Sequence, residues 1–193
     1  MPHTPPAPIA SSALLVIDVQ DSFKAGARWA QRGNPRFEDN LRRLLAAYRA
    51  AHLPVIFFLH SDEDEHFQTD SPAYRLMDFV QPLPGETLLH KTTRNCFTST
   101  RLQQLLTQRG IRRLIVTGIQ TEQCCETTAR LGGDLGYDVD FVSEATLTFP
   151  IPLVPGRREG ELPVEAVVER TEFALRRRFA RIASVDDILA EVA

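Results

Sequence analysis

The sequence predicts an α/β fold in which a mainly parallel sheet lies between two layers of helices, a three-layer α/β/α sandwich. The first observation is a set of short, continuous apolar runs at residues 13–17, 55–59 and 114–117, which are typical of strands buried on both faces. The second is that segments with helical spacing of apolar residues separate these runs. Strands that alternate with helices indicate parallel pairing, because each parallel connection needs a crossover.

Length, charge and cysteine content limit the class of protein. We expect one domain over residues 13–193, after an extended or disordered segment at residues 1–12. The net charge of −3 predicts no nucleic-acid partner. Three cysteines, two of them adjacent, do not make a disulfide framework, which favours a cytoplasmic location. The sequence shows no pattern of a signal peptide and no apolar run of membrane-spanning length, so we expect no membrane association.

The first half of the chain contains two strands, one helix and a long loop. The apolar run 13–17 is a buried strand that ends on Asp18. Leucines at helical spacing predict a helix over residues 37–51, which is followed by the second strand at 55–59. Residues 60–84 are acidic and irregular, so we expect a long loop with one short helix.

The middle of the chain continues the alternation of strands and helices. A short strand at residues 87–90 ends on Lys91, and leucines spaced for a helix follow at 99–108. The run 114–117 is a further buried strand, and we expect Gly118 to stop it.

The last third completes the sheet and its covering layers. A strand is expected at residues 139–142, then a loop at 149–163 that contains four prolines and two glycines. The length of this loop suggests a lid or a subunit contact. Residues 164–179 form a helix, 181–183 an edge strand and 185–192 a closing helix.

A cysteine lies just after the strand at 114–117. Thr121 is a good N-cap residue, so a helix should start there and place Cys124 in its first turn. Backbone N–H groups and the helix dipole at that position favour a thiolate. The simpler interpretation is a small buried side chain, since free cysteines are usually structural. Neighbouring Cys125 suits packing better, and Cys96 has no role that the sequence reveals.

Three polar residues occupy equivalent places in the predicted sheet. Asp18, Lys91 and Cys124 each follow a strand or its turn, so they can meet in a crevice at the carboxyl ends of the strands. Lys91 would stabilise the thiolate, and Asp18 would act as general base and then general acid. The backbone N–H groups of Gln120 and Cys124 would stabilise the oxyanion. The alternative for Asp18 and Lys91 is a structural ion pair.

Three blocks of sequence carry these residues, and together they resemble those of the isochorismatase-like cysteine hydrolases. The blocks run from Asp18 to Phe23, from Lys91 to Thr100 and from Gly118 to Cys124. The resemblance implies a six-stranded, Rossmann-like sheet and an Asp18, Lys91, Cys124 catalytic triad. It also implies a cis peptide bond between Ile119 and Gln120, and assembly into a homodimer or larger homo-oligomer.

The resemblance leaves three functions open. The presence of Cys124 favours hydrolysis of a C–N bond in a small amide or carbamoyl compound through a thioester intermediate. The second function is isochorismatase-type hydrolysis of a vinyl ether, which would use Asp18 without the thiol. The third is a non-catalytic or redox-sensing role, in which Cys124 and Cys125 form a strained disulfide.

The partner that the sequence predicts is a small-molecule substrate. Arg94 and Asn95 could bind a carboxylate or carbonyl group, and Gln20 could also contact the substrate. Phe23 and Trp29 could form an apolar wall of the pocket. For each of these residues, packing or surface exposure is the alternative.

The nicotinamidase branch of the family looks like a zinc enzyme, with an Asp-x-His pair and a further histidine in the loop after the second strand. Here that loop runs from His60 to His66 and is rich in acidic residues. Asp62, Asp64 and His66 carry donor atoms that could capture a metal. We interpret the loop instead as a solvated acidic segment and expect no metal and no cofactor.

Overall fold

The computed structural model describes residues 6–152 and 160–193. Its main sheet has six strands in the order β3-β2-β1-β4-β5-β8, and every neighbouring pair is parallel. The predicted α/β fold with a parallel sheet is therefore confirmed. The strands are β1 (Ser12–Ile17), β2 (Val55–His60), β3 (Thr87–Lys91), β4 (Arg113–Ile119), β5 (Asp138–Leu147) and β8 (Arg181–Ile182).

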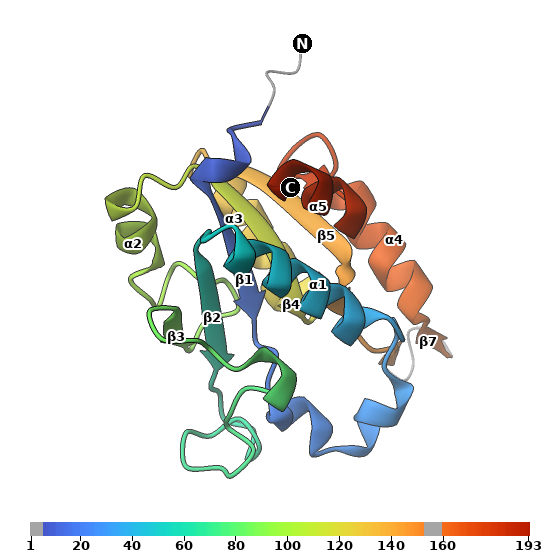
Figure 1. Cartoon of the computed structure of the whole chain (residues 1–193). Coiled ribbons are helices and arrows are strands. Elements are labelled where there is room, and N and C mark those ends of the chain that lie inside the picture. Colours follow the sequence, from blue (N-terminus) through green and yellow to red (C-terminus); the bar gives the residue numbers. More distant parts are fainter. Residues whose placement is uncertain (1–5, 153–159) are drawn as a thin grey trace.

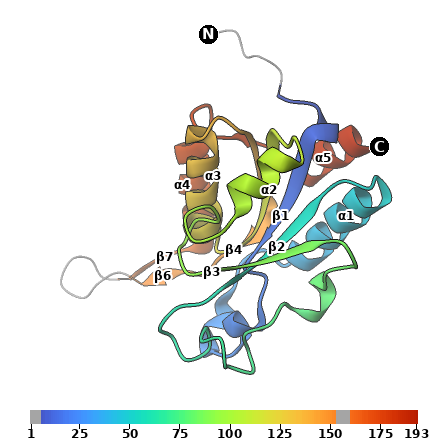
Figure 2. The ribbon, with the colours of Figure 1, turned by 90° about the vertical axis from the view of Figure 1, so that its left-hand side faces the viewer.

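Helices cover both faces of this sheet (Figures 1 and 2). The buried side chains of α1 (Phe37–Ala50) and α5 (Val185–Val192) belong to the core on one face. Those of α2 (Leu102–Gln108), α3 (Glu126–Asp134) and α4 (Val164–Leu175) belong mainly to the core on the other. None of the helices in the described residues combines the length and apolarity that a membrane span requires.

Strand β1 shows why the buried strands are continuous apolar runs. Leu14 and Val16 pack in the core on the α1 side, whereas Leu15 and Ile17 pack in the core on the α3 side. Successive side chains of a strand point to opposite faces, so a strand covered on both faces favours apolar side chains at consecutive positions. Each fully buried side chain of this size contributes roughly 1.5–3 kcal/mol to stability.

Two predicted helices are shorter than expected. Helix α2 begins at Leu102 and not at Ser99, because the Thr100 hydroxyl accepts a hydrogen bond from the Leu102 N–H and donates one to the Cys96 carbonyl. Helix α4 ends at Leu175, since the backbone leaves the helix and adopts a left-handed φ of 63° at Arg177.

The sequence predicted that Gly118 would end β4, but this residue lies inside the strand. Its φ is +124°, and a Cβ atom added there would lie 2.0 Å from the carbonyl oxygen of Ile17 on β1. The register between β4 and β5 also shifts between Val116 and Gly118. Glycine therefore allows β1 and β4 to approach closely beside Asp18.

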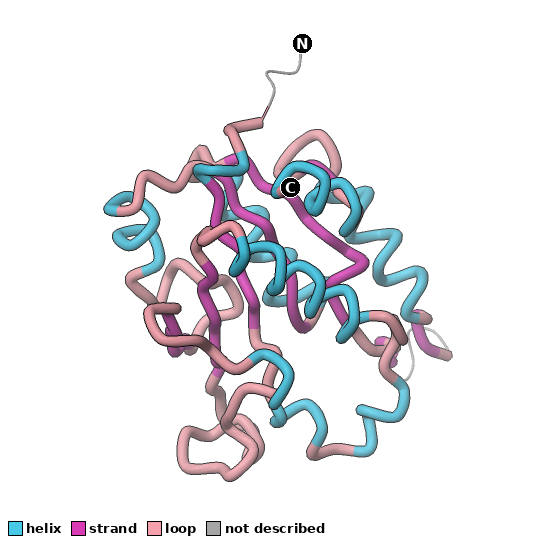
Figure 3. Tube along the Cα trace, viewed as in Figure 1, coloured by secondary structure: helices cyan, strands magenta, loops and turns pink. Residues whose placement is uncertain are grey.

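The long loop after β2 agrees with the prediction and contains one short helix, η4 (Asp78–Val80) (Figure 3). The predicted loop at 149–163 is not irregular throughout, since β6 (Ile151–Pro152) pairs with β7 (Glu161–Leu162) as an antiparallel ladder. Residues 153–159 lie outside the described residues, and a role as lid or subunit contact stays a prediction.

The segment before the sheet differs in part from the extended or disordered stretch predicted for residues 1–12. A 3₁₀ turn, η1, spans Ile9–Ser11, and Ser12 already belongs to β1. Residues 1–5 lie outside the described residues, so the prediction is not tested there.

Candidate active site

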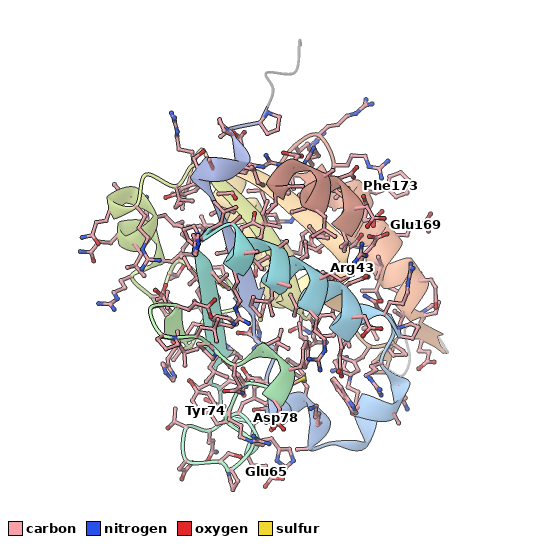
Figure 4. The ribbon with its side chains drawn as sticks, in the orientation of Figure 1. Arg43, Glu65, Tyr74, Asp78, Glu169 and Phe173 are labelled. Atoms are coloured by element: carbon pink, nitrogen blue, oxygen red, sulfur yellow. The ribbon has the colours of Figure 1, made fainter. Side chains whose placement is uncertain are left out.

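The carboxyl ends of the parallel strands bring the three predicted catalytic residues together. Asp18 directly follows β1, Lys91 is the last residue of β3, and Cys124 lies in the turn after β4. The short helices η2 (Asp21–Lys24) and η3 (Ala27–Gln31) and the loop after β2 gather at the same end of the sheet (Figure 1). Glu65, Tyr74 and Asp78 mark that loop in Figure 4. The chain changes direction across the sheet between β1 and β4, which is where α/β proteins bind ligands.

Lys91 contacts both other residues of the predicted triad. Its Nζ lies 2.7 Å from Asp18 Oδ2 and 3.4 Å from Cys124 Sγ. The side chains of Asp18 and Lys91 are completely buried, and Cys124 is 4% exposed. The second carboxylate oxygen of Asp18, Oδ1, has no hydrogen-bond partner within the described residues. A buried carboxylate oxygen without a partner costs free energy. Protonation would reduce that cost, so Oδ1 can accept a proton from a nearby group.

The electrostatics differ from the sequence prediction in one respect. Burial, and then the Asp18 carboxylate, raise the pKa of the Cys124 thiol well above its ordinary value. The prediction that the helix start favours a thiolate is therefore wrong for the free protein, since loss of solvent outweighs the dipole and Lys91. Burial also raises the pKa of Asp18. Burial would lower the pKa of Lys91, but the charges of Asp18 and Cys124 raise it.

The backbone around Cys124 forms one turn of π-helix, η5 (Thr121–Cys125), before α3. Thr121 is not the N-cap, because its hydroxyl donates to Thr146 Oγ1 at 2.8 Å and Gln120 precedes the turn. The Gln120 carbonyl accepts from the N–H groups of Gln123 and Cys125, both at 3.2 Å. The peptide bond between Ile119 and Gln120 is cis.

His60, the last residue of β2, contacts Lys91 and was missed by the sequence analysis. Its Nδ1 lies 3.3 Å from Lys91 Nζ, and its Nε2 lies 3.3 Å from Asp62 Oδ2 and contacts the Arg94 guanidinium. Burial, and then the charges of Lys91 and Arg94, lower the pKa of His60 to about 4. The imidazole is therefore neutral near pH 7. Its place at a strand end, like that of Asp18, was the signal that could have identified it.

Gln20, proposed as a substrate ligand, has its side chain bonded to the protein itself. Its Nε2 donates to Ser22 Oγ at 2.8 Å and to the His60 carbonyl at 3.1 Å. Its Oε1 accepts from the His60 N–H at 2.8 Å. Gln20 is fully buried, so it fixes the end of β2 relative to β1.

Two further residues proposed to contact the substrate, Asn95 and Trp29, instead make contacts within the protein. Asn95 Oδ1 accepts hydrogen bonds from the N–H groups of Phe97 and Thr98, which closes the turn that follows β3. Trp29 packs behind Phe149, with ring centroids 6.3 Å apart. Neither residue lines the cavity at Cys124.

A cavity of about 290 Å³ opens onto Cys124. Of the proposed substrate ligands, Phe23 and Arg94 line it. Arg94 is not free for a ligand in this state, because it pairs with Asp62 at 3.2 Å. Three phenylalanines form one side of the cavity, since the Phe23 ring packs against Phe67 at 4.9 Å and against Phe149 at 6.0 Å. The space suits a small molecule with a flat apolar part.

A larger cavity, of about 590 Å³, lies at the opposite end of the sheet, beside the first residues of β5 and β8. It is lined by the exposed residues Arg176 to Arg178 and contains none of the predicted catalytic residues. Its size therefore does not make it the reaction site, because it lacks a nucleophile.

The acidic loop after β2 uses its donor groups within the protein. The loop was expected to lack the Asp-x-His spacing of the nicotinamidase branch, but Asp64 and His66 have it. In the structure Asp64 Oδ1 accepts a hydrogen bond from the His66 N–H at 2.9 Å. Asp62 pairs with Arg94. Across residues 6–152 and 160–193, no three His, Cys, Asp or Glu side chains gather as a metal site would require. The expectation that the protein uses no metal stays a prediction.

Comparison with known proteins places this geometry in a family. An isochorismatase domain model matches residues 12–183. The uncharacterized isochorismatase family protein YrdC of Bacillus subtilis is 31% identical over 139 residues, which cover 71% of this chain and 74% of YrdC. Nicotinamidase 3 of Arabidopsis thaliana is 32% identical over 154 residues, which cover 72% of this chain and 74% of that enzyme.

A solved structure agrees over the whole chain. The crystal structure of an isochorismatase-family protein from Chromobacterium violaceum superposes with a TM-score of 0.88 at 28% sequence identity, and covers 100% of this chain and 98% of its own. The chain belongs to the isochorismatase family of hydrolases.

Proposed function

We propose that the protein hydrolyses the C–N bond of a small amide or carbamoyl compound, with Cys124 as nucleophile and a thioester as intermediate. The observation that carries this proposal is the contact of Lys91 with both Asp18 and Cys124, at 2.7 and 3.4 Å, beside a small cavity. A relative that is 32% identical bears the name nicotinamidase, which is that of an amide hydrolase.

The first half of the reaction forms the thioester. Because the pKa of Cys124 is raised, the thiol loses its proton to Asp18 as Sγ attacks the carbonyl carbon. The carbonyl oxygen becomes an oxyanion, and the backbone N–H groups of Gln120 and Cys124 stabilise it. The tetrahedral adduct then collapses, the C–N bond breaks, and Asp18 returns the proton to the departing nitrogen as ammonia or an amine.

The second half of the reaction releases the acid. Asp18, again a carboxylate, takes a proton from a water molecule whose oxygen attacks the thioester carbonyl. The C–S bond breaks, the proton returns to the sulfur, and a carboxylic acid leaves. Lys91 keeps its charge throughout and lowers the energy of the thiolate as a leaving group.

Replacement of Cys124 tests the covalent route. Cys124→Ala should reduce ammonia release from a panel of small amides by about three orders of magnitude or more, because the nucleophile is lost. Cys125→Ala is the matched control, since that thiol is fully buried in the core, and should retain turnover. Undiminished turnover by Cys124→Ala would refute the thioester.

Vinyl ether hydrolysis predicts a different result for the same variants. In that reaction Asp18 protonates the substrate and the thiol has no role. Activity on isochorismate that survives Cys124→Ala but is abolished by Asp18→Asn would therefore replace our proposal with the ether hydrolase.

A further inference from the structure

His60 is held beside Lys91 by the sheet itself. The two residues are partners in the register of β2 and β3. Gln20 clamps the backbone of His60 from the β1 side, through its N–H at 2.8 Å and its carbonyl at 3.1 Å. The imidazole is 3% exposed. The ring therefore has a fixed place, which a surface histidine would not have.

The contacts of the ring determine which nitrogen accepts a hydrogen bond. A neutral imidazole has one donor and one acceptor nitrogen. Nδ1 faces Lys91 Nζ at 3.3 Å, and an ammonium can only donate. Nε2 faces both a donor, Arg94, and an acceptor, Asp62 Oδ2 at 3.3 Å. The Lys91 side chain is completely buried and paired with Asp18, whereas the Arg94 side chain is half exposed and also reaches Asp62. Nδ1 is therefore the acceptor, and Nε2–H donates to Asp62.

The same contact limits where the Lys91 amine can lie. Its Nζ donates to the carbonyls of Thr93 and Arg94, at 3.1 and 3.2 Å, and forms the ion pair with Asp18. These groups and His60 Nδ1 surround the amine together with Cys124 Sγ. His60 Nδ1 is the one nitrogen acceptor among them. The three N–H groups of the ammonium are shared among these five acceptors. Loss of His60 Nδ1 would therefore leave the amine free to move toward the Thr93 and Arg94 carbonyls and away from its place between Asp18 and Cys124.

We propose that His60 is a positioning residue, whose neutral imidazole accepts a hydrogen bond from Lys91 at Nδ1 and so fixes the amine between Asp18 and Cys124. The inference rests on the proposed function of Cys124 as a nucleophile. It adds Gln20 as the residue that anchors His60, and Asp62 as the group that sets its tautomer.

Three substitutions separate the two sides of the ring. His60→Asn places an amide oxygen near the position of Nδ1, His60→Gln places one near Nε2, and His60→Leu removes both. The first readout is the rate at which iodoacetamide alkylates Cys124, followed by peptide mass spectrometry, which requires no substrate. We expect about tenfold slower alkylation in His60→Leu and His60→Gln, and a rate within about threefold of the original in His60→Asn, since one charge-assisted hydrogen bond is at issue.

Turnover of an amide substrate gives the second readout. The kcat of His60→Leu should fall about 10–100-fold while KM changes less than about threefold, because the contact acts on the nucleophile and not on substrate binding. His90→Leu is the matched control. His90 is exposed on β3 and its Nδ1 bonds to the Tyr74 hydroxyl at 2.9 Å, so neither readout should change.

Either of two results would overturn the proposal. The first is that His60→Leu, shown by circular dichroism to be folded, is alkylated as fast as the unmodified protein. The second is an equal loss in His60→Asn and His60→Gln, which also decides the matter if the leucine variant fails to fold. A protein that hydrolyses no amide at all would contradict the proposed function, but the alkylation rates would still test the role of His60.

Discussion

Arg28 lies near the start of η3 and Arg32 directly follows its end, and each guanidinium lies over an aromatic ring. Arg28 lies 4.7 Å from the centroid of Phe149 and lines the cavity at Cys124. Arg32 lies 4.6 Å from the centroid of Trp29, away from the cavity. No acidic side chain in the described residues pairs with Arg28. The cavity therefore has a cation that a substrate carboxylate can reach.

This difference predicts the charge of good substrates. Arg28→Gln should raise KM about tenfold for an amide that carries a second, carboxylate group, since a charge-assisted hydrogen bond is lost. KM for the uncharged amide of the same skeleton should stay the same. Arg32→Gln should alter neither value. Equal effects of Arg28→Gln on the two amides would show that this arginine does not read the charge.

The residues that were predicted correctly as neighbours share one property. Asp18, Lys91 and Cys124 follow buried strands or their turns, and the carboxyl ends of parallel strands meet at one edge. The direction of a side chain in a loop depends on contacts distant in sequence, which is why Gln20 and Asn95 were assigned to the substrate although they bond to the protein. Their hydrogen-bond partners could not be read from sequence spacing.

Strand β4 shows how one backbone position shapes the active-site edge. Gly118→Ala would place a methyl group 2.0 Å from the Ile17 carbonyl oxygen at a φ of +124°. We expect a loss of at least about 3 kcal/mol of unfolding free energy, because a steric clash adds to an unfavourable φ. Urea unfolding followed by circular dichroism would measure it.

Gly110→Ala is the matched control for that substitution. Gly110 also has a positive φ, +66°, but a Cβ atom there would meet nothing within 4 Å. Its cost should be about 1–2 kcal/mol, from the left-handed conformation alone. Similar losses in the two variants would mean that the contact between β1 and β4 relaxes.

Elements were predicted well where hydrophobic periodicity determines them and less well at their ends. The strands β1 and β2 and the helix α1 match the predicted ranges to within one residue. The predictions for the end of α4 and for the end of β4 at Gly118 were wrong. A turn at Arg177 ends the helix, and the close approach of Ile17 requires a glycine inside the strand. Both are tertiary effects that a local pattern does not contain.

The closing helix α5 is tied to the sheet by Glu191, which joins two strands. Its carboxylate contacts Arg113 of β4 at 2.6 Å and Arg181 of β8 at 2.8 Å. Both arginines also pair with Asp140 of β5. The network thus links three strands and the last helix at the amino ends of the strands, opposite the cavity at Cys124.

This network predicts a pH dependence of stability. Hydrogen bonds from Arg113 lower the pKa of Glu191 from its ordinary 4.5 to about 2. A carboxylate with a lowered pKa stabilises the fold fully above its unfolded value, and the contribution disappears as pH falls through the folded value. Glu191→Gln should therefore lower the melting temperature at pH 7, and the difference from the original protein should shrink between pH 4.5 and 2.

Glu169→Gln provides the control for that titration. Glu169 is exposed on α4 (Figure 4) and forms no ion pair with the described residues. Its melting temperature should follow that of the original protein across the whole range. A Glu191 difference that persists unchanged at pH 2 would assign the effect to packing of α5 and not to charge.

The different accessibility of the three cysteine thiols allows the folded fraction of a sample to be measured by chemical labelling. Cys96 and Cys125 are wholly enclosed in the core, whereas Cys124 meets the cavity. A compact electrophilic dye should therefore attach once per intact molecule and three times per denatured one. Counting attached dyes by mass would report the fraction of denatured chains in any preparation, without an engineered tag.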